Sequence, residues 1–173
     1  MARPEMAAAQ QPVRAYIGIG SNLSDPQAQV RAALKALACL PCSRLAAHSG
    51  LYRSRPLAGM DQPDYINAVA AIDTTLDPHA LLAALQALEN DQGRVRDGER
   101  WAARTLDLDL LLYGDRQLAT DTLTVPHPGL RERSFVLYPL QEIAAQLRLP
   151  DGARLSDVIE ACTAAPATRI GDA

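Results

Sequence analysis

The sequence of 173 residues has few aromatic residues and few cysteines, and it lacks any long apolar run. With one Trp, one Phe and five Tyr, Ala and Leu must fill most of the core. Three cysteines are too few for a disulfide framework, which favours a reducing, cytoplasmic setting. No apolar run approaches the ~18 residues of a membrane span, so we expect no membrane contact. The length predicts a single domain.

The net charge of −3 gives the chain no overall basic character for binding nucleic acid. Residues 1–13, mostly Ala, Gln and Pro, lack the apolar stretch of a signal peptide, and we predict that they form a disordered tail.

Common nucleotide signatures are also absent. Gly18-Ile-Gly20 lacks the third glycine of a dinucleotide fingerprint, since Leu23 stands there, and no GxxxxGK[ST] loop is present. We interpret these glycines as a tight turn at a strand end.

The pair Cys39-Leu-Pro-Cys42 has the spacing of a redox or zinc motif. A redox pair usually opens a helix, whereas this pair falls at the end of a helical pattern. A zinc site would need a second pair of ligands, which is not visible. An incidental occurrence is therefore favoured over a functional one.

Apolar patterning predicts four strands, at 14–20, 44–54, 65–72 and 105–113, and two amphipathic helices. The helices begin at Asp25-Pro26 and Asp77-Pro78, where aspartate is a good N-cap and proline suits the first turn. The order β-α-β-β-α-β is typical of an α+β ferredoxin-like sandwich, an antiparallel sheet with helices packed on it. A mostly helical C-terminal extension follows. We expect one domain at 14–160 and a C-terminal tail at 161–173.

The last predicted strand, Thr105–Tyr113, carries the clearest chemical signal. Alternate side chains of a strand share a face, so four leucines are expected on one face and two aspartates on the other. The leucines are Leu106, Leu108, Leu110 and Leu112. Asp107 and Asp109 at this spacing can bind one hard cation or two neighbouring ones. The alternative is a half-buried strand with a solvated acidic face.

A loop rich in arginine leads into this strand. Its basic residues and its one aromatic residue are Arg94, Arg96, Arg100, Arg104 and Trp101. Guanidinium groups hold phosphate oxygens through paired hydrogen bonds. Next to a carboxylate pair, such a loop predicts a site for a metal–triphosphate complex. The alternative is a solvated charge cluster in which Asp97 and Glu99 pair locally with the arginines.

Four stretches together resemble one enzyme family. They are AYIGIGSNL (15–23), DQPDYINAV (61–69), GRVRDGERWAARTLDLDLLLYG (93–114) and LTVPHPGLRERSFVL (123–137). Through them the chain resembles the 6-hydroxymethyl-7,8-dihydropterin pyrophosphokinase family of folate biosynthesis. The resemblance implies a ferredoxin-like fold and transfer of the β,γ-pyrophosphoryl group of ATP to the pterin hydroxymethyl oxygen, with release of AMP. It also implies two Mg²⁺ ions.

The resemblance further implies roles for individual residues. The implied catalytic residues are Arg94, Arg104, Asp107 and Asp109, of which the two aspartates bind Mg²⁺. The implied ATP-binding residues are Gln86, Glu89, Arg94, Arg96, Arg100, Trp101, Arg104, Leu110, His127 and Arg133. The implied pterin-binding residues are Ser54, Arg55, Pro56, Leu57, Tyr65, Asn67, Trp101, Asp107 and Phe135. The amide of Asn67 can donate to and accept from the polar edge of a pterin, and the aromatic residues can stack on its faces.

Two positions depart from the family pattern. Arg55 stands where proline is common, and Pro128 follows the histidine where some members have tyrosine. Two other functions stay open: another two-metal phosphotransferase or phosphohydrolase, and a ferredoxin-like module that binds RNA or a protein. The predicted strands offer Tyr16, Tyr52 and Tyr65 but little basic charge for RNA. We expect ATP and the pterin as partners, no nucleic acid, and a monomer.

Overall fold

The computed structural model describes residues 10–56, 60–92 and 106–173. The strands of the main sheet are β1 (Val13–Ser21), β2 (Ser43–His48), β3 (Leu51–Ser54), β4 (Tyr65–Thr74), β5 (Asp107–Tyr113) and β8 (Thr168–Gly171). The helices are α1 (Pro26–Ala38), α2 (Pro78–Asp91), α3 (Ser134–Ile143) and α4 (Leu155–Ala161), and a 3-10 turn η1 spans Leu130–Glu132. A short ribbon pairs β6 (Leu118–Ala119) with β7 (Thr124–Val125).

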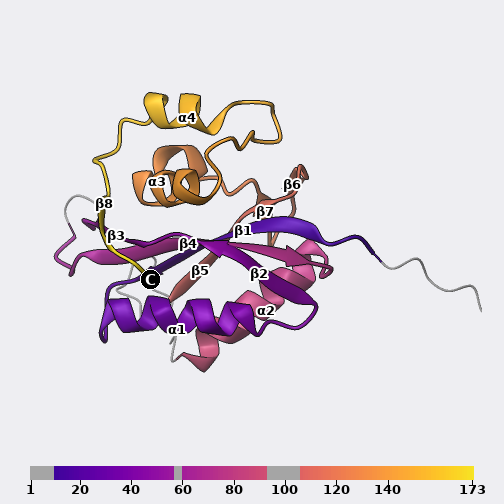
Figure 1. The fold of residues 1–173 in the computed structure, drawn as a ribbon, viewed down its shortest axis with the longest axis horizontal. Coiled ribbons are helices and arrows are strands. Elements are labelled where there is room, and N and C mark those ends of the chain that lie inside the picture. The colour runs from indigo at the N-terminus through magenta and orange to yellow at the C-terminus, as the bar shows by residue number, and fades with distance from the viewer. Residues whose placement is uncertain (1–9, 57–59, 93–105) are drawn as a thin grey trace, which may run out of the picture.

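The main sheet lies between two layers of helices (Figure 1). Its strand order is β5-β1-β4-β3-β8, and β2 pairs with β4 beside β3. Every described pairing is antiparallel, which confirms the expected mixture of helices and antiparallel sheet. Helices α1 and α2 cover one face, and α3 and α4 lie over the other (Figure 1). In the described ranges no helix is long and apolar enough to span a bilayer.

Both predicted helices start at their Asp-Pro pairs. The Asp77 side chain accepts the backbone N–H groups of His79 and Ala80, each at 3.0 Å. Asp25 accepts the N–H of Ala28 at 3.3 Å. These bonds satisfy helix N–H groups that have no partner within the helix, so the local sequence alone sets where each helix begins.

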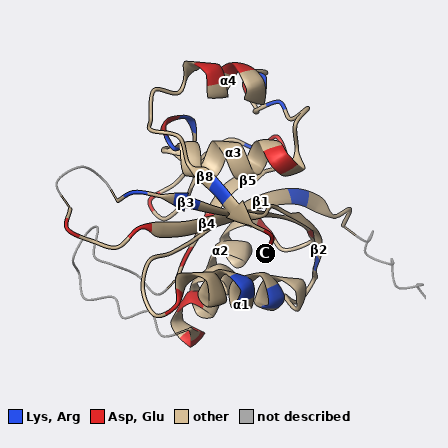
Figure 2. Ribbon diagram, turned by 60° about the vertical axis from the view of Figure 1, so that its left-hand side comes forward, with Lys and Arg blue, Asp and Glu red and all other residues tan. Residues whose placement is uncertain are grey.

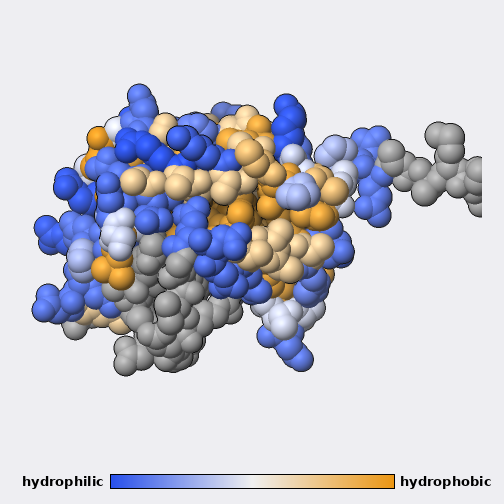
Figure 3. All heavy atoms as spheres, turned by 90° about the horizontal axis from the view of Figure 1, so that it is seen from below, coloured by the Kyte–Doolittle hydropathy of each residue, from blue (hydrophilic) through white to orange (hydrophobic). Residues whose placement is uncertain are grey.

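Each face of the sheet has its own buried core. Ile17 and Ile72 point toward α1 and α2, where they pack with leucines such as Leu37 and Leu85. The core on the other face consists mainly of apolar side chains from β4, β5, α3 and α4. Figure 3 views the α1 and α2 side, where apolar side chains remain visible among polar ones. The sheet is therefore held by apolar packing from both sides.

Strand β5 departs from the predicted alternation. Its register with β1 shifts between Tyr16 and Ile17, which leaves Leu111 as an extra residue. Leu110 packs in the core toward α1 and α2, whereas Leu111 and Leu112 belong to the core toward α3. The prediction that Leu112 shares a face with the other three leucines is therefore wrong, because the bulge reverses the alternation beyond it.

Two further segments differ from expectation. The strand predicted at 44–54 is broken into β2 and β3 by Ser49, whose Oγ accepts the N–H of Val69 at 2.9 Å. The segment 161–173 was expected as a tail, but it contains β8, which pairs with β3. Four residues are too short for a periodic signal, so only the structure reveals this strand.

Candidate active site

The two aspartates of β5 lie on the sheet face that α3 covers. Leu108 and Leu110, which alternate with them, are buried on the opposite face, as predicted. Asp107 is paired with Gly20 of β1, and Asp109 is paired with Gly18. Both aspartates are partly exposed. On this face of the sheet their carboxylates therefore lie beside two glycines of β1, which present no side chain.

His127 and Arg133 approach Asp109 from the loop that leads into α3. The Asp109 Oδ2 lies 3.7 Å from the Arg133 Nη1 and 3.9 Å from the His127 Nε2. Arg133 lies across Gly129, since a Cβ there would be only 2.5 Å from the Arg133 Nε. Both distances are too long for hydrogen bonds, so the N–H groups of Arg133 and His127 remain able to donate elsewhere.

The backbone of the loop fixes the tautomer of His127. Its Nδ1 accepts the N–H of Gly129 at 3.0 Å, which leaves the ring proton on Nε2. Its own backbone N–H donates to the carbonyl of Leu111 at 2.9 Å, so the bulge in β5 anchors the histidine. Burial, and then the charge of Arg133, lower the pKa of His127, while Asp107 opposes this change. The neutral ring therefore presents an Nε2–H donor near Asp109.

Asn67 lies on the same face, one strand beyond Gly20. Its side chain is 4% exposed, and its Nδ2 donates to the Ser54 Oγ at 2.9 Å and to the Tyr52 carbonyl at 3.4 Å. A Cβ at Gly20 would lie 3.3 Å from the Asn67 Oδ1. The amide oxygen is therefore directed over Gly20. Tyr65 precedes Asn67 by two residues and points to the same face.

Asn67, Gly20 and Asp107 form one row across three neighbouring strands. Adjacent strands lie ~4.8 Å apart, so the backbones of Asn67 and Asp107 are separated by about 10 Å. Glycine leaves the middle of this row open. A flat polar ring placed over Gly20 would contact the amide at one end and direct a reacting group toward the carboxylates at the other.

The tight turn predicted at Gly18 and Gly20 is wrong. Gly18 and Gly20 lie inside the strand, paired on both sides, and not in a turn at its end. Sequence reasoning therefore missed Gly20 as part of the site. The signal that could have revealed it is the alternation of Tyr16, Gly18 and Gly20, which places two glycines on one strand face.

Gln86 and Glu89 belong to α2, which packs on the face opposite the aspartates. Glu89 is 2% exposed, and its Oε1 accepts the N–H of Leu108 at 2.7 Å. It thereby satisfies a backbone donor on the outer edge of β5. Leu110 is also buried toward this face. Contacts of these three residues with ATP stay predictions.

Phe135, in the first turn of α3, is partly buried against the core on this side of the sheet, and the Arg133 guanidinium carbon lies 5.9 Å from its ring centroid. Arg55 and Pro56 directly follow Ser54 at the end of β3. Six predicted site residues lie outside the described residues: Leu57, Arg94, Arg96, Arg100, Trp101 and Arg104.

The aspartates suit a magnesium ion. The described part of the chain holds no group of three or more His, Cys, Asp or Glu residues that could enclose a metal. Magnesium rarely needs such a cage, because it is commonly bound by one or two carboxylates together with water and substrate phosphates. Asp107 and Asp109 supply the carboxylates for that arrangement.

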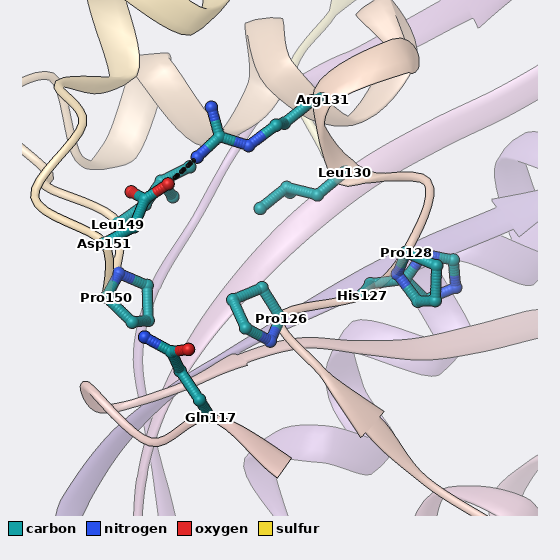
Figure 4. A pocket seen from close by; sticks show the side chains of 9 residues that line it. All are labelled: Gln117, Pro126, His127, Pro128, Leu130, Arg131, Leu149, Pro150 and Asp151. Atoms are coloured by element: carbon teal, nitrogen blue, oxygen red, sulfur yellow. Dashed lines mark hydrogen bonds and ion pairs between the residues drawn. The ribbon is translucent and has the colours of Figure 1, made fainter. Parts of the chain in front are cut away.

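A hollow of about 270 Å³ adjoins His127 on the other side of its loop. His127 and Pro128 lie at one end of it, and the ion pair of Arg131 with Asp151 lies at the other (Figure 4). Its described lining does not include the aspartates or Asn67. It is therefore separate from the row across β4, β1 and β5.

Known proteins resemble this chain along most of its length. The model of the family 7,8-dihydro-6-hydroxymethylpterin-pyrophosphokinase (HPPK) matches residues 16–145. A Pseudomonas aeruginosa protein named 2-amino-4-hydroxy-6-hydroxymethyldihydropteridine pyrophosphokinase is 54% identical over 149 residues, which are 86% of this chain and 91% of that protein. A Haemophilus influenzae protein of the same name is 49% identical over 148 residues, 86% of this chain and 92% of that protein.

A solved structure of wild-type Plasmodium falciparum HPPK-DHPS with pteroate superimposes with a TM-score of 0.72. The match covers 90% of this chain but 43% of that longer chain, and at 10% identity it supports the fold alone. The family match and the two close relatives cover most of the sequence, including Asp107, Asp109 and Asn67. The chain belongs to the HPPK family.

Proposed function

We propose that this chain transfers a pyrophosphoryl group from ATP to 6-hydroxymethyl-7,8-dihydropterin, releasing AMP, as a step of folate biosynthesis. The observation that carries the proposal is the open row from Asn67 across Gly20 to Asp107. It joins a polar anchor for a flat ring to a carboxylate pair suited to a metal–triphosphate complex. The relatives from P. aeruginosa and H. influenzae bear the name of this activity.

The acceptor would lie over Gly20. Because Asn67 Nδ2 is engaged by Ser54 and Tyr52, its Oδ1 would accept N–H groups from the pterin edge. Tyr65 and Phe135 would stack on the ring faces. Ser54, Arg55, Pro56 and Leu57 would border the ring from the end of β3. This placement directs the hydroxymethyl group toward Asp107.

The triphosphate would lie beside β5. Asp107 and Asp109 would hold two Mg²⁺ ions, which supply positive charge to the phosphate oxygens. The His127 Nε2–H and the Arg133 guanidinium would donate hydrogen bonds to phosphate oxygens. The hydroxymethyl oxygen would attack the β-phosphorus in line and lose its proton to solvent, while the bond from that phosphorus to the oxygen that bridges it to the α-phosphate would break, and AMP would leave with that oxygen. Gln86, Glu89 and the arginines of residues 94–104 would complete the ATP site.

The finer fold assignment is also a proposal. The order of strands β5, β1, β4 and β2/β3, all antiparallel and with α1 and α2 on one face, supports a ferredoxin-like sandwich. Helices α3 and α4 would form its C-terminal extension, and the domain predicted at 14–160 would extend to include β8, because β8 pairs with β3 in the main sheet. A monomeric state and a cytoplasmic location also stay predictions.

One assay separates this function from its alternatives. AMP formation is followed from ATP and Mg²⁺ with and without 6-hydroxymethyl-7,8-dihydropterin. We expect AMP, and an equal amount of the pterin diphosphate, only when the pterin is present. AMP or ADP formed at the same rate without it would indicate a different phosphotransferase or hydrolase. No turnover under either condition would favour a binding module.

A further inference from the structure

Glu142 of α3 accepts three hydrogen bonds at the edge of the sheet. Its Oε2 accepts the Tyr52 hydroxyl at 2.6 Å, and its Oε1 accepts the Gly50 N–H at 3.1 Å. The Arg169 guanidinium of β8 donates to the same Oε1 at 3.4 Å. One carboxylate therefore ties α3 to both β3 and the C-terminal strand. Hydrogen bonds to an ionised acceptor are stronger than neutral ones.

The ionisation of this group is favourable at neutral pH. Burial raises the pKa of Glu142, but the hydrogen bonds from Tyr52, Gly50 and Arg169 and the charge of Arg169 together lower it by more, so its pKa is below the ordinary value. Burial and the Glu142 hydrogen bond raise the pKa of Tyr52 to about 12. Tyr52 is thus a donor and Glu142 an ionised acceptor throughout the physiological range.

The C-terminal strand holds β3 from its other side. β8 pairs with β3, with Tyr52 opposite Arg169, and Figure 2 shows the two strands together at the sheet edge. Gly50 allows this approach, because a Cβ there would lie 2.6 Å from both the Arg169 Nη2 and the Gly171 carbonyl oxygen. Arg169 is itself held by Asp172 at 2.6 Å. Strand β3 is therefore held by α3 through Glu142 and by β8 at the edge of the sheet.

Strand β3 in turn orients the amide of Asn67. The two acceptors of the Asn67 Nδ2 group are the Tyr52 carbonyl and the Ser54 hydroxyl, both in β3. With Nδ2 fixed on β3, Oδ1 lies over Gly20. A shift or rotation of β3 would therefore turn the amide group that faces the acceptor ring.

We infer that Glu142, through its hydrogen bonds to Tyr52 and Gly50, is a positioning residue that sets the orientation of Asn67 for the pterin substrate, with Arg169 of the C-terminal strand as its partner. This inference rests on the proposed function. Neither residue touches the open row itself. Both act through β3, and the effect concerns the pterin and not the triphosphate, whose groups are on β5 and the loop before α3.

The test uses Glu142→Gln and Tyr52→Phe in the full chain, with Arg131→Gln as the matched control. Arg131 also forms a surface ion pair in the C-terminal half, with Asp151, but it has no contact with β3 among the described residues. We expect each test variant to raise the KM for the pterin by roughly 10-fold while kcat and the KM for ATP change by less than about 2-fold. Arg131→Gln should change none of these values.

The side-chain NH₂ resonance of Asn67 provides a readout that needs no turnover. It should shift in Glu142→Gln and Tyr52→Phe but not in Arg131→Gln. In the double variant the KM effects should be less than multiplicative, because both substitutions break the same bond. An unmoved Asn67 resonance in both folded single variants would overturn the inference. If the unmodified chain formed no AMP in the presence of the pterin, the proposed function would instead be overturned.

Discussion

Gly20 and Asn67 are direct partners in the pairing of β1 with β4, and a Cβ atom on residue 20 would lie 3.3 Å from the Asn67 Oδ1. The amide oxygen therefore faces a position that has no side chain. The same glycine is paired on its other side with Asp107. This relationship leaves the middle of the site open and joins its two ends.

Replacing Gly20 by Ala should narrow this open position. The added methyl would crowd the Asn67 Oδ1 and the lower face of the bound ring, because neighbouring strands fix the backbone on both sides. We expect the KM for the pterin to rise by roughly 10-fold or more, with the KM for ATP nearly unchanged. Steady-state kinetics with each substrate varied in turn would measure both values.

Gly18→Ala is the matched control for that substitution. Its Cβ would lie 3.3 Å from a terminal methyl of Leu111, a flexible side chain, and would not meet Asn67. Equal effects of the two alanine variants on the pterin KM would argue against an acceptor seated over Gly20.

Neutralising either aspartate of β5 should remove most of the activity. Asp107→Asn and Asp109→Asn keep the shape of the side chain but remove the charge that a cation requires, and we expect kcat to fall by ~10²–10³-fold. Asp115→Asn, in the exposed turn after β5, is the control and should be active. Near-normal turnover of both Asp107→Asn and Asp109→Asn would exclude this pair as the metal ligands.

The tautomer of His127 leads to a prediction about its replacements. Glutamine can place an N–H group near the position of Nε2, whereas asparagine reaches only the position of Nδ1, which already accepts from Gly129. His127→Gln should therefore retain more activity than His127→Asn, by roughly 3- to 10-fold. Initial rates at saturating pterin would rank them. If asparagine were the better replacement, the Nε2–H donor would not be the group that matters.

Asp73 should make the stability of the fold depend on pH. It accepts from Arg14 at 2.6 Å and from Arg44 at 2.8 Å, and these bonds, that of Arg14 foremost, lower the pKa of Asp73 below its ordinary value of 3.8. A lowered pKa stabilises the folded state above the ordinary value, and this contribution is lost as the pH falls through the folded pKa. Asp73→Asn should cost about 0.5–1 kcal/mol of unfolding free energy at pH 7, because both arginines are largely exposed.

Urea unfolding at several pH values would test that effect. The difference between the unmodified chain and Asp73→Asn should shrink steadily below pH 3.8. Asp121→Asn, in an exposed turn, should leave the unfolding free energy unchanged at every pH. A difference that stayed constant down to pH 2 would show that the ion pairs do not cause it.

The sequence predicts those parts of the fold that depend on residues close together in the chain. The caps Asp25 and Asp77 act within three residues of themselves, and the aspartates of β5 alternate with leucines over one short segment. The bulge at Leu111 could not be predicted, because it depends on the register with β1 and on the N–H of His127. The roles of Gly20 and Glu142 likewise arise from strands and a helix that meet only in three dimensions.

Leu111 is one residue more than β1 can pair with, and its carbonyl holds the backbone of His127. A chain that lost this single residue, with Tyr113 still anchored to the Leu76 carbonyl, could keep Leu112 opposite Tyr16 and Leu110 opposite Ile17, now in regular alternation. Asp107 and Asp109 would therefore keep their face of the sheet, but the carbonyl that accepts the His127 backbone N–H would be gone. The loss of one codon, in frame and outside the predicted metal ligands, would thus release the histidine from β5 while leaving both aspartates in place.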